Sequence, residues 1–150
     1  MPGDDHARPS IGSPKRKPWD ISENIRSFPC EATTLDLYMH ENSLERVDFL
    51  KIDVEGAEYL VLEGGNDLLA SHQPILFFEM WDSYMHDFGT TPKDFCEIIL
   101  GAGYDRFTVI QDILYHFNDL KTELPRLLRG GILNLVCGKS SLHNIRFKSL

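Results

Sequence analysis

The most constraining feature of the chain is the segment VDFLKIDVEGAEYLVLEG, which spans residues 47–64. The interior of residues 47–54 is apolar apart from Lys51, a pattern typical of a strand buried on both faces in the middle of a parallel sheet. Gly56 then permits a sharp turn. From about Ala57 onward, apolar residues recur at helical spacing and predict a helix with one face in the core. The segment therefore predicts a strand, a turn and a helix in succession.

A second strand and a second helix are predicted further along. The short apolar run at residues 75–79 follows a proline and fits another buried strand. Thr91 is suited to be a helix N-cap, with Pro92 at the first helical position and Asp94 near the positive end of the helix dipole. This part of the chain repeats the order of strand followed by helix.

Two more strands complete the predicted order. They are residues 104–110 and 132–137, and between them residues 112–129 stay ambiguous because Pro125 interrupts a helical spacing of leucines. Strands that alternate with helices indicate an α/β fold with a parallel sheet and right-handed crossovers.

Three carboxylates stand at the ends of the first two predicted strands. Asp53 ends the first strand, Glu55 follows in the turn, and Glu79 ends the second strand. Ligand sites in open α/β sheets form at the carboxyl ends of strands, so we expect these three acids to face one crevice. Lys51 and Asp53 share a face of their strand, and a buried Lys51 would need Asp53 as its partner.

Neighbouring residues have two interpretations. Glu58 is either a solvated residue that gains from the helix N-terminus or a further acid of the same turn. Trp81, Tyr84, Met85 and His86 follow Glu79, and they either line a pocket or cover the core beneath a loop. His86 is a candidate general base only if it points into the crevice.

Composition and charge exclude several classes of function. The formal net charge of -8 argues against a nucleic-acid partner, and no apolar run approaches the roughly 18 residues of a membrane span. Cys30, Cys96 and Cys137 form no CxxC pair, so we expect no structural zinc and a reducing, cytoplasmic location. Residues 1–24 are rich in proline and glycine and predict a disordered low-complexity tail, whereas residues 25–150 predict one domain.

The block VDFLKIDVEGAEYLVLEGG, followed by QPILFFE, resembles the FkbM family of S-adenosylmethionine-dependent methyltransferases. That family carries a Lys-Ile-Asp-Val-Glu-Gly-Ala-Glu block after a Thr-Leu-Asp segment, and a strand that ends in Glu soon afterwards. Thr34, Leu35 and Asp36 match the upstream element. The resemblance covers residues 33–79 by sequence and extends to about Lys139 by the order of elements.

The resemblance implies a Rossmann-like methyltransferase sheet, mostly parallel, with an antiparallel final strand. On that template residues 47–54 are similar to the fourth strand and residues 75–79 to the fifth, while residues 104–110 and 132–137 are similar to the closing pair. The glycine-rich cofactor loop of the family is absent before residue 47. The resemblance therefore implies a partial domain, its C-terminal half, and poor cofactor affinity for this chain alone.

The resemblance also implies O-methylation of a hydroxyl on a sugar or small natural product, with S-adenosylmethionine as the donor. Asp53, Glu55 and Glu79 are then the catalytic candidates, as general base or as positioning groups, and Asp53, Val54 and Glu55 are the candidates for cofactor contact. The acids also make Mg²⁺ possible without demanding it. A non-catalytic binding or assembly module and a metal-assisted hydrolase stay open as alternatives. The bare edge of a half sheet predicts a homodimer or poor solubility.

Overall fold

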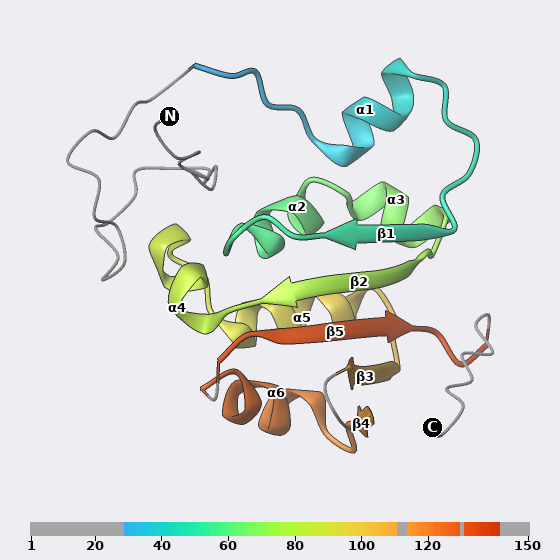
Figure 1. Ribbon diagram of the computed structural model, residues 1–150. Helices are drawn as coiled ribbons and strands as arrows, with labels where there is room; N and C mark the ends of the chain where they lie inside the picture. Colours follow the sequence, from blue (N-terminus) through green and yellow to red (C-terminus); the bar gives the residue numbers. More distant parts are fainter. Residues whose placement is uncertain (1–28, 111–113, 130, 142–150) are drawn as a thin grey trace, which may run out of the picture.

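The computed structural model describes residues 29–110, 114–129 and 131–141 (Figure 1). The predicted tail at residues 1–24 lies outside these ranges. No helix within them has the length and apolar character needed to cross a membrane. The elements follow in the order α1 (Leu35–Glu41), β1 (Phe49–Ile52), α2 (Glu58–Glu63), α3 (Asn66–Ser71), β2 (Ile75–Met80), α4 (Asp82–Met85), η1 (His86–Phe88), α5 (Pro92–Gly101), β3 (Arg106–Ile110), β4 (Leu114–His116), α6 (Leu120–Leu128) and β5 (Leu133–Gly138).

The strands form one five-stranded sheet with the order β1-β2-β5-β3-β4. β1 pairs in parallel with β2, whereas the β2–β5, β5–β3 and β3–β4 pairs are antiparallel. The antiparallel direction predicted for the final strand is confirmed. The prediction of a mostly parallel sheet is wrong for the described strands, because β5 inserts between β2 and β3 and separates two strands that point the same way. The fold is therefore mixed α/β.

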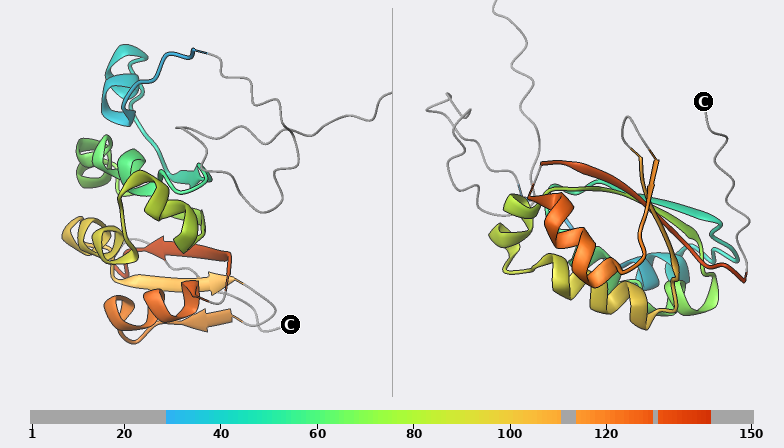
Figure 2. Two further views of the ribbon diagram at one scale, coloured as in Figure 1. Left: turned by 90° about the vertical axis from the view of Figure 1, so that its left-hand side faces the viewer. Right: turned by 90° about the horizontal axis from the view of Figure 1, so that it is seen from below.

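The helices cover one face of the sheet (Figure 2). Leu76, Phe78 and Met80 of β2 are buried, while Glu79, whose side chain points to the opposite face, is half-buried. Phe78 packs edge-on against Phe95 of α5, with the ring centroids 4.9 Å apart. The hydrophobic core therefore lies between the sheet and its helices, and the face that carries Glu79 has no helix over it in the described part of the chain.

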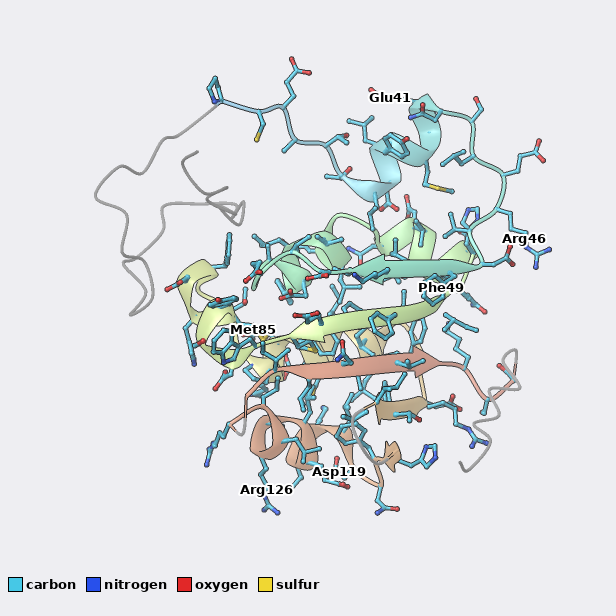
Figure 3. All side chains as sticks on the ribbon, in the orientation of Figure 1. Glu41, Arg46, Phe49, Met85, Asp119 and Arg126 are labelled. Carbon is cyan, nitrogen blue, oxygen red and sulfur yellow. The ribbon has the colours of Figure 1, made fainter. Side chains whose placement is uncertain are left out.

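β1 is the outermost strand of the described sheet. Phe49 (Figure 3) is 56% exposed, Lys51 is exposed, and Ile52 is the only residue of this strand that is buried. The prediction of a central strand buried on both faces is therefore wrong for the described residues, because one face of β1 is uncovered there. The outer edge of β1 pairs with no other described strand. The homodimer expected through this edge stays a prediction.

α5 begins as its sequence predicts. The Thr91 hydroxyl accepts a hydrogen bond from the Asp94 amide at 3.3 Å, and the Asp94 carboxylate accepts one from the Thr91 amide at 2.8 Å. Pro92 occupies the first turn, where its missing N–H costs nothing. Phe95 and Ile99 then face the core. This reciprocal capping fixes the start of the helix that supports β2.

The Thr34, Leu35 and Asp36 triplet has a structural role. The Thr34 hydroxyl accepts a hydrogen bond from the Leu37 amide at 3.2 Å and caps α1. The Asp36 carboxylate accepts hydrogen bonds from the amides of Asp67 at 3.0 Å and Leu68 at 2.9 Å. Asp36 therefore provides hydrogen-bond acceptors for backbone amides in the first turn of α3, and these bonds hold α1 against α3.

The stretch that stayed ambiguous contains a short strand and a helix. Leu120, Leu124 and Leu128 of α6 are buried at helical spacing, with Pro125 inside the helix. The strand is β4, which pairs with β3 at the end of the described sheet. The apolar spacing therefore outweighs the interruption that a proline introduces.

Candidate functional site

The turn between β1 and α2 has an unusual backbone. Glu55 has a φ of 54° and Gly56 a φ of 104°, so two successive residues lie in the region that favours glycine. For Glu55 this conformation costs about 1–3 kcal/mol. A Cβ added to Gly56 would lie 2.3 Å from the carbonyl carbon and oxygen of Tyr84. The turn therefore requires glycine at position 56 and is packed tightly against α4.

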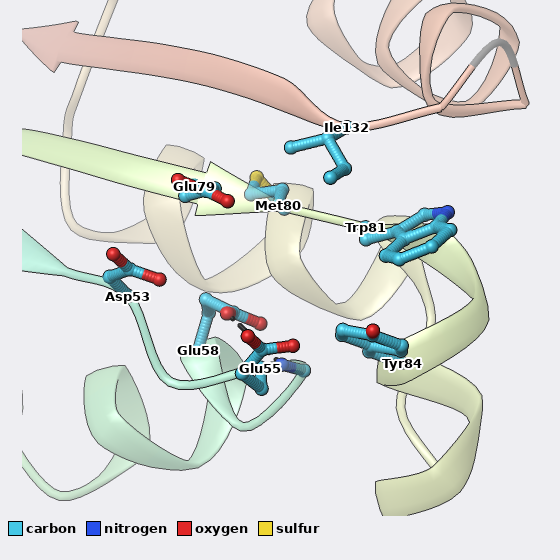
Figure 4. Close-up of a pocket in the computed structure, with 9 residues that line it drawn as sticks. Asp53, Glu55, Glu58, Glu79, Met80, Trp81, Tyr84 and Ile132 are labelled. Carbon is cyan, nitrogen blue, oxygen red and sulfur yellow. Dashed lines mark hydrogen bonds between the residues drawn. The ribbon is translucent and has the colours of Figure 1, made fainter. Parts of the chain in front are cut away.

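This turn forms one wall of a pocket at the carboxyl ends of β1 and β2 (Figure 4). Asp53 and Glu55 follow β1 and Glu79 belongs to β2, so the three acids predicted from the sequence line a single crevice. The empty volume is about 280 Å³, including open solvent at the mouth. Most of that volume is open to solvent, so the enclosed part suits only a small group of a ligand. The lining residues are Asp53, Glu55, Gly56, Glu58, Glu79, Met80, Trp81, Tyr84 and Ile132.

Asp53 is held by Lys51. The Lys51 Nζ atom donates a hydrogen bond to Asp53 Oδ2 at 2.9 Å, and this bond, followed by the charge of Asp53, raises the pKa of Lys51. The predicted pairing is confirmed. The predicted burial of Lys51 is wrong, because its side chain is 55% exposed on the uncovered face of the sheet. Lys51 therefore orients the Asp53 carboxylate at the edge of the pocket.

Glu58 is the acid that sequence reasoning left undecided, and the structure buries it completely. Its Oε1 atom accepts a hydrogen bond from the Gly56 amide at 3.1 Å, whereas its Oε2 atom is buried with no hydrogen-bond partner in the described part of the chain. Burial raises the pKa of Glu58, although backbone amides, including that of Gly56, oppose the shift. The solvated interpretation of Glu58 is therefore wrong. No local signal in the sequence marks this burial, because Glu58 has the spacing of an ordinary helix residue.

Glu58→Gln tests this burial through the pH dependence of stability. The pKa of Glu58 in the folded state lies above its ordinary value of 4.5, so the unfolded chain loses this proton first as the pH rises. We expect the free energy of unfolding of the wild type to fall relative to Glu58→Gln from about pH 4.5 upward, until the folded-state pKa is passed. Urea unfolding at a series of pH values measures this difference. Glu63→Gln, an exposed change on the same helix, is the control, and equal pH profiles for all three proteins would contradict the interpretation.

An aromatic pair forms another side of the pocket. The rings of Trp81 and Tyr84 are 4.5 Å apart between centroids and tilted by 47°. Met85 is fully buried in the core, and His86 is exposed with its Nε2 atom 3.4 Å from Asp82 Oδ1. Trp81 and Tyr84 therefore line the pocket, Met85 covers the core, and His86 is not among the lining residues.

The described residues offer no clustered ligand set for a metal. No group of three or more His, Cys, Asp or Glu side chains within them is arranged to hold an ion. Asp53, Glu55 and Glu79 line the same pocket, but their side chains are not arranged to hold one metal ion together. The Mg²⁺ possibility and the metal-assisted hydrolase therefore find no support in the described geometry.

The cysteines are remote from this chemistry. Cys96 and Cys137 are buried, as their apolar surroundings predict. Burial raises the pKa of Cys96 to about 11 and that of Cys137 well above its ordinary value. Both thiols therefore stay protonated and unreactive at neutral pH.

One comparison with known proteins identifies a relationship. A family model described as the methyltransferase FkbM domain matches residues 3–106, which is more than half of the chain and includes Asp53, Glu55, Glu58 and Glu79. No curated protein and no solved structure matches the chain. The match begins at residue 3, inside the segment whose composition predicts a disordered tail. It therefore extends well upstream of the VDFLKIDVEGAEYLVLEGG block, which starts at Val47.

Proposed function

Because the chain belongs to the FkbM methyltransferase family, we propose that it is a methyltransferase domain that uses S-adenosylmethionine to methylate a hydroxyl group on a sugar or small natural product. This proposal rests mainly on one observation, which is that Asp53, Glu55 and Glu79 line the same pocket. The pocket lies at the carboxyl ends of two parallel strands, where ligand sites of α/β sheets form.

The acids have distinct parts in the proposed reaction. A hydroxyl oxygen reacts when it is held in line with the methyl group and loses its proton to a nearby base. Either Asp53, oriented by Lys51, or Glu55 accepts the hydrogen bond from the acceptor hydroxyl and takes its proton. Glu79, on β2, helps to position the acceptor from the neighbouring strand. The strained backbone at Glu55 fixes the direction of its side chain relative to the pocket.

The lining residues fit the charged end of S-adenosylmethionine. Asp53, Val54 and Glu55 are the residues we propose to contact it. The carboxylates of Asp53 and Glu55, which line the pocket, complement its positive charge, and Val54 lies between them in the chain without lining the pocket. The bound cofactor supplies the methyl group. The nucleoside end would need a glycine-rich turn, and the sequence has none of the Asp-x-Gly-x-x-x-Gly type before residue 47. We therefore propose that the described sheet corresponds to the C-terminal half of a Rossmann-like domain.

A second candidate is a non-catalytic binding or assembly module derived from a methyltransferase, in which the strand-end pocket binds a ligand without methyl transfer. Isothermal titration calorimetry separates the two. We expect S-adenosylmethionine to give a weak, saturable heat at one ligand per chain, and adenosine, which lacks the charged end, to bind less. No heat at millimolar S-adenosylmethionine would contradict the methyltransferase and leave the module.

We also propose a cytoplasmic location and a homodimer. The location rests on the free thiols of Cys30, Cys96 and Cys137, which are typical of a reducing compartment. The dimer rests on the outer edge of β1, which no described strand covers and where Phe49 is exposed. A monodisperse monomer by light scattering would contradict the dimer.

A further inference from the structure

We propose that the strand-end pocket is a subsite for a protonated amine, held by the unpaired carboxylate oxygen of Glu58. The proposal rests on the proposed function, because it makes the methyl acceptor a compound that carries an ammonium group near its hydroxyl, such as an amino sugar. Three features of the pocket support it: its charge, the unsatisfied oxygen of Glu58 and its aromatic wall.

The charge of the pocket calls for a cation. Four carboxylates line it, those of Asp53, Glu55, Glu58 and Glu79, and Figure 4 shows Glu58 among the other three. Lys51 pairs with Asp53 at its edge. Burial, and to a smaller extent the charge of Asp53, raises the pKa of Glu58, and a positive charge beside Glu58 offsets both effects. A sugar hydroxyl donates one hydrogen bond and brings no charge, whereas an ammonium group brings three donors and a positive charge.

The second feature is the Oε2 atom of Glu58. The side chain is fully buried, and its Oε1 atom is satisfied by the Gly56 amide. Its Oε2 atom has no hydrogen-bond partner among the described residues, which is unfavourable for a buried polar atom unless water or a ligand supplies the donor. Since the atom is shielded from solvent, the ligand must displace part of the lining. Figure 4 shows the half-buried Glu55 side chain beside that of Glu58, where it could be moved aside. Side-chain rearrangements of this size are common on binding.

The third feature is the apolar part of the lining. The faces of Trp81 and Tyr84 attract an organic cation, while Met80 and Ile132 contact the carbon atoms of a small ring. The volume of about 280 Å³ includes open solvent at the mouth, so the lining encloses the ammonium group and leaves the ring that carries it at the mouth. A hexosamine combines these properties, because it is a single ring with an amine and several hydroxyl groups.

Titration of the full chain with glucosamine and glucose tests the proposal, because the two sugars differ in the amine alone. Slightly below neutral pH, where the amine is protonated, we expect glucosamine to bind at least tenfold more tightly than glucose. Glu58→Gln should weaken glucosamine binding about tenfold, equivalent to about 1.4 kcal/mol, and leave glucose binding unchanged. Glu63→Gln, on the exposed side of the same helix, should change neither affinity.

Three outcomes would overturn the proposal. The first is equal affinity of the wild type for the two sugars, a result that does not depend on how any variant folds. The second is an equal effect of Glu58→Gln and Glu63→Gln on glucosamine binding. The third is a Glu58→Gln variant that weakens S-adenosylmethionine but neither glucosamine nor S-adenosylhomocysteine, which would assign Glu58 to the cofactor. None of the sugar titrations contains a methyl donor, so failure of the proposed methyltransferase activity would leave this result interpretable.

Discussion

Gly56→Ala is expected to lower the free energy of unfolding by about 3 kcal/mol or more. The backbone at Gly56 has a φ of 104°, which costs a non-glycine residue about 1–3 kcal/mol. The added methyl group would also lie 2.3 Å from the backbone of Tyr84, and overpacking of this kind costs about 1–3 kcal/mol more. Urea unfolding followed by circular dichroism measures the loss.

Gly101→Ala is the matched control for this change. Gly101 ends α5, and a Cβ built there meets no heavy atom of the described residues within 4 Å. We expect alanine at this position to leave the stability unchanged or to raise it by up to about 1 kcal/mol, because alanine favours the helix. Equal losses for the two variants would show that the close approach between the turn and α4 does not hold the site together.

Asp53→Asn is expected to remove methyl transfer while the fold stays intact. A general base contributes about 10²–10⁴-fold to a rate, so we expect turnover to fall at least 100-fold. The ion pair between Asp53 and Lys51 is largely exposed, and such pairs contribute about 0–1 kcal/mol, so stability should change little. Release of S-adenosylhomocysteine, measured over a panel of hydroxylated acceptors, gives the rate, and thermal unfolding checks the fold.

Asp48→Asn is the control for the role of Asp53. Asp48 pairs with Arg46 just before β1 begins, so it is also an exposed, ion-paired aspartate, but it does not line the pocket. Its replacement should leave turnover unchanged. Retained turnover in Asp53→Asn, or a similar loss in both variants, would defeat the proposed role of Asp53.

Much of the site was predictable because its signals are local. The apolar run before Asp53, the turn at Gly56 and the apolar run before Glu79 each indicate a strand end, and parallel strands bring their ends to one edge. The capping residues of α5 act within one turn of helix, so Thr91 and Asp94 were predictable for the same reason.

The features of the fold and the site that could not be predicted depend on contacts between segments that are distant in the sequence. The position of β5 between β2 and β3 is decided by long-range pairing, which no local pattern encodes. The uncovered face of β1 depends on what packs above it, so the exposure of Lys51 could not be read from its apolar neighbours. Glu58 has the spacing of an ordinary helix residue, so its burial could not be read from the residues around it in the sequence.

Chemical-shift mapping tests most directly whether the strand-end pocket is the ligand site. Adding S-adenosylmethionine to the ¹⁵N-labelled chain should shift the amides of residues 53–56 and 79–84, which surround the pocket, and should leave those of α3 and of the α5 C-terminus in place. Saturable shifts confined to another surface, with none at residues 53–56, would contradict the account.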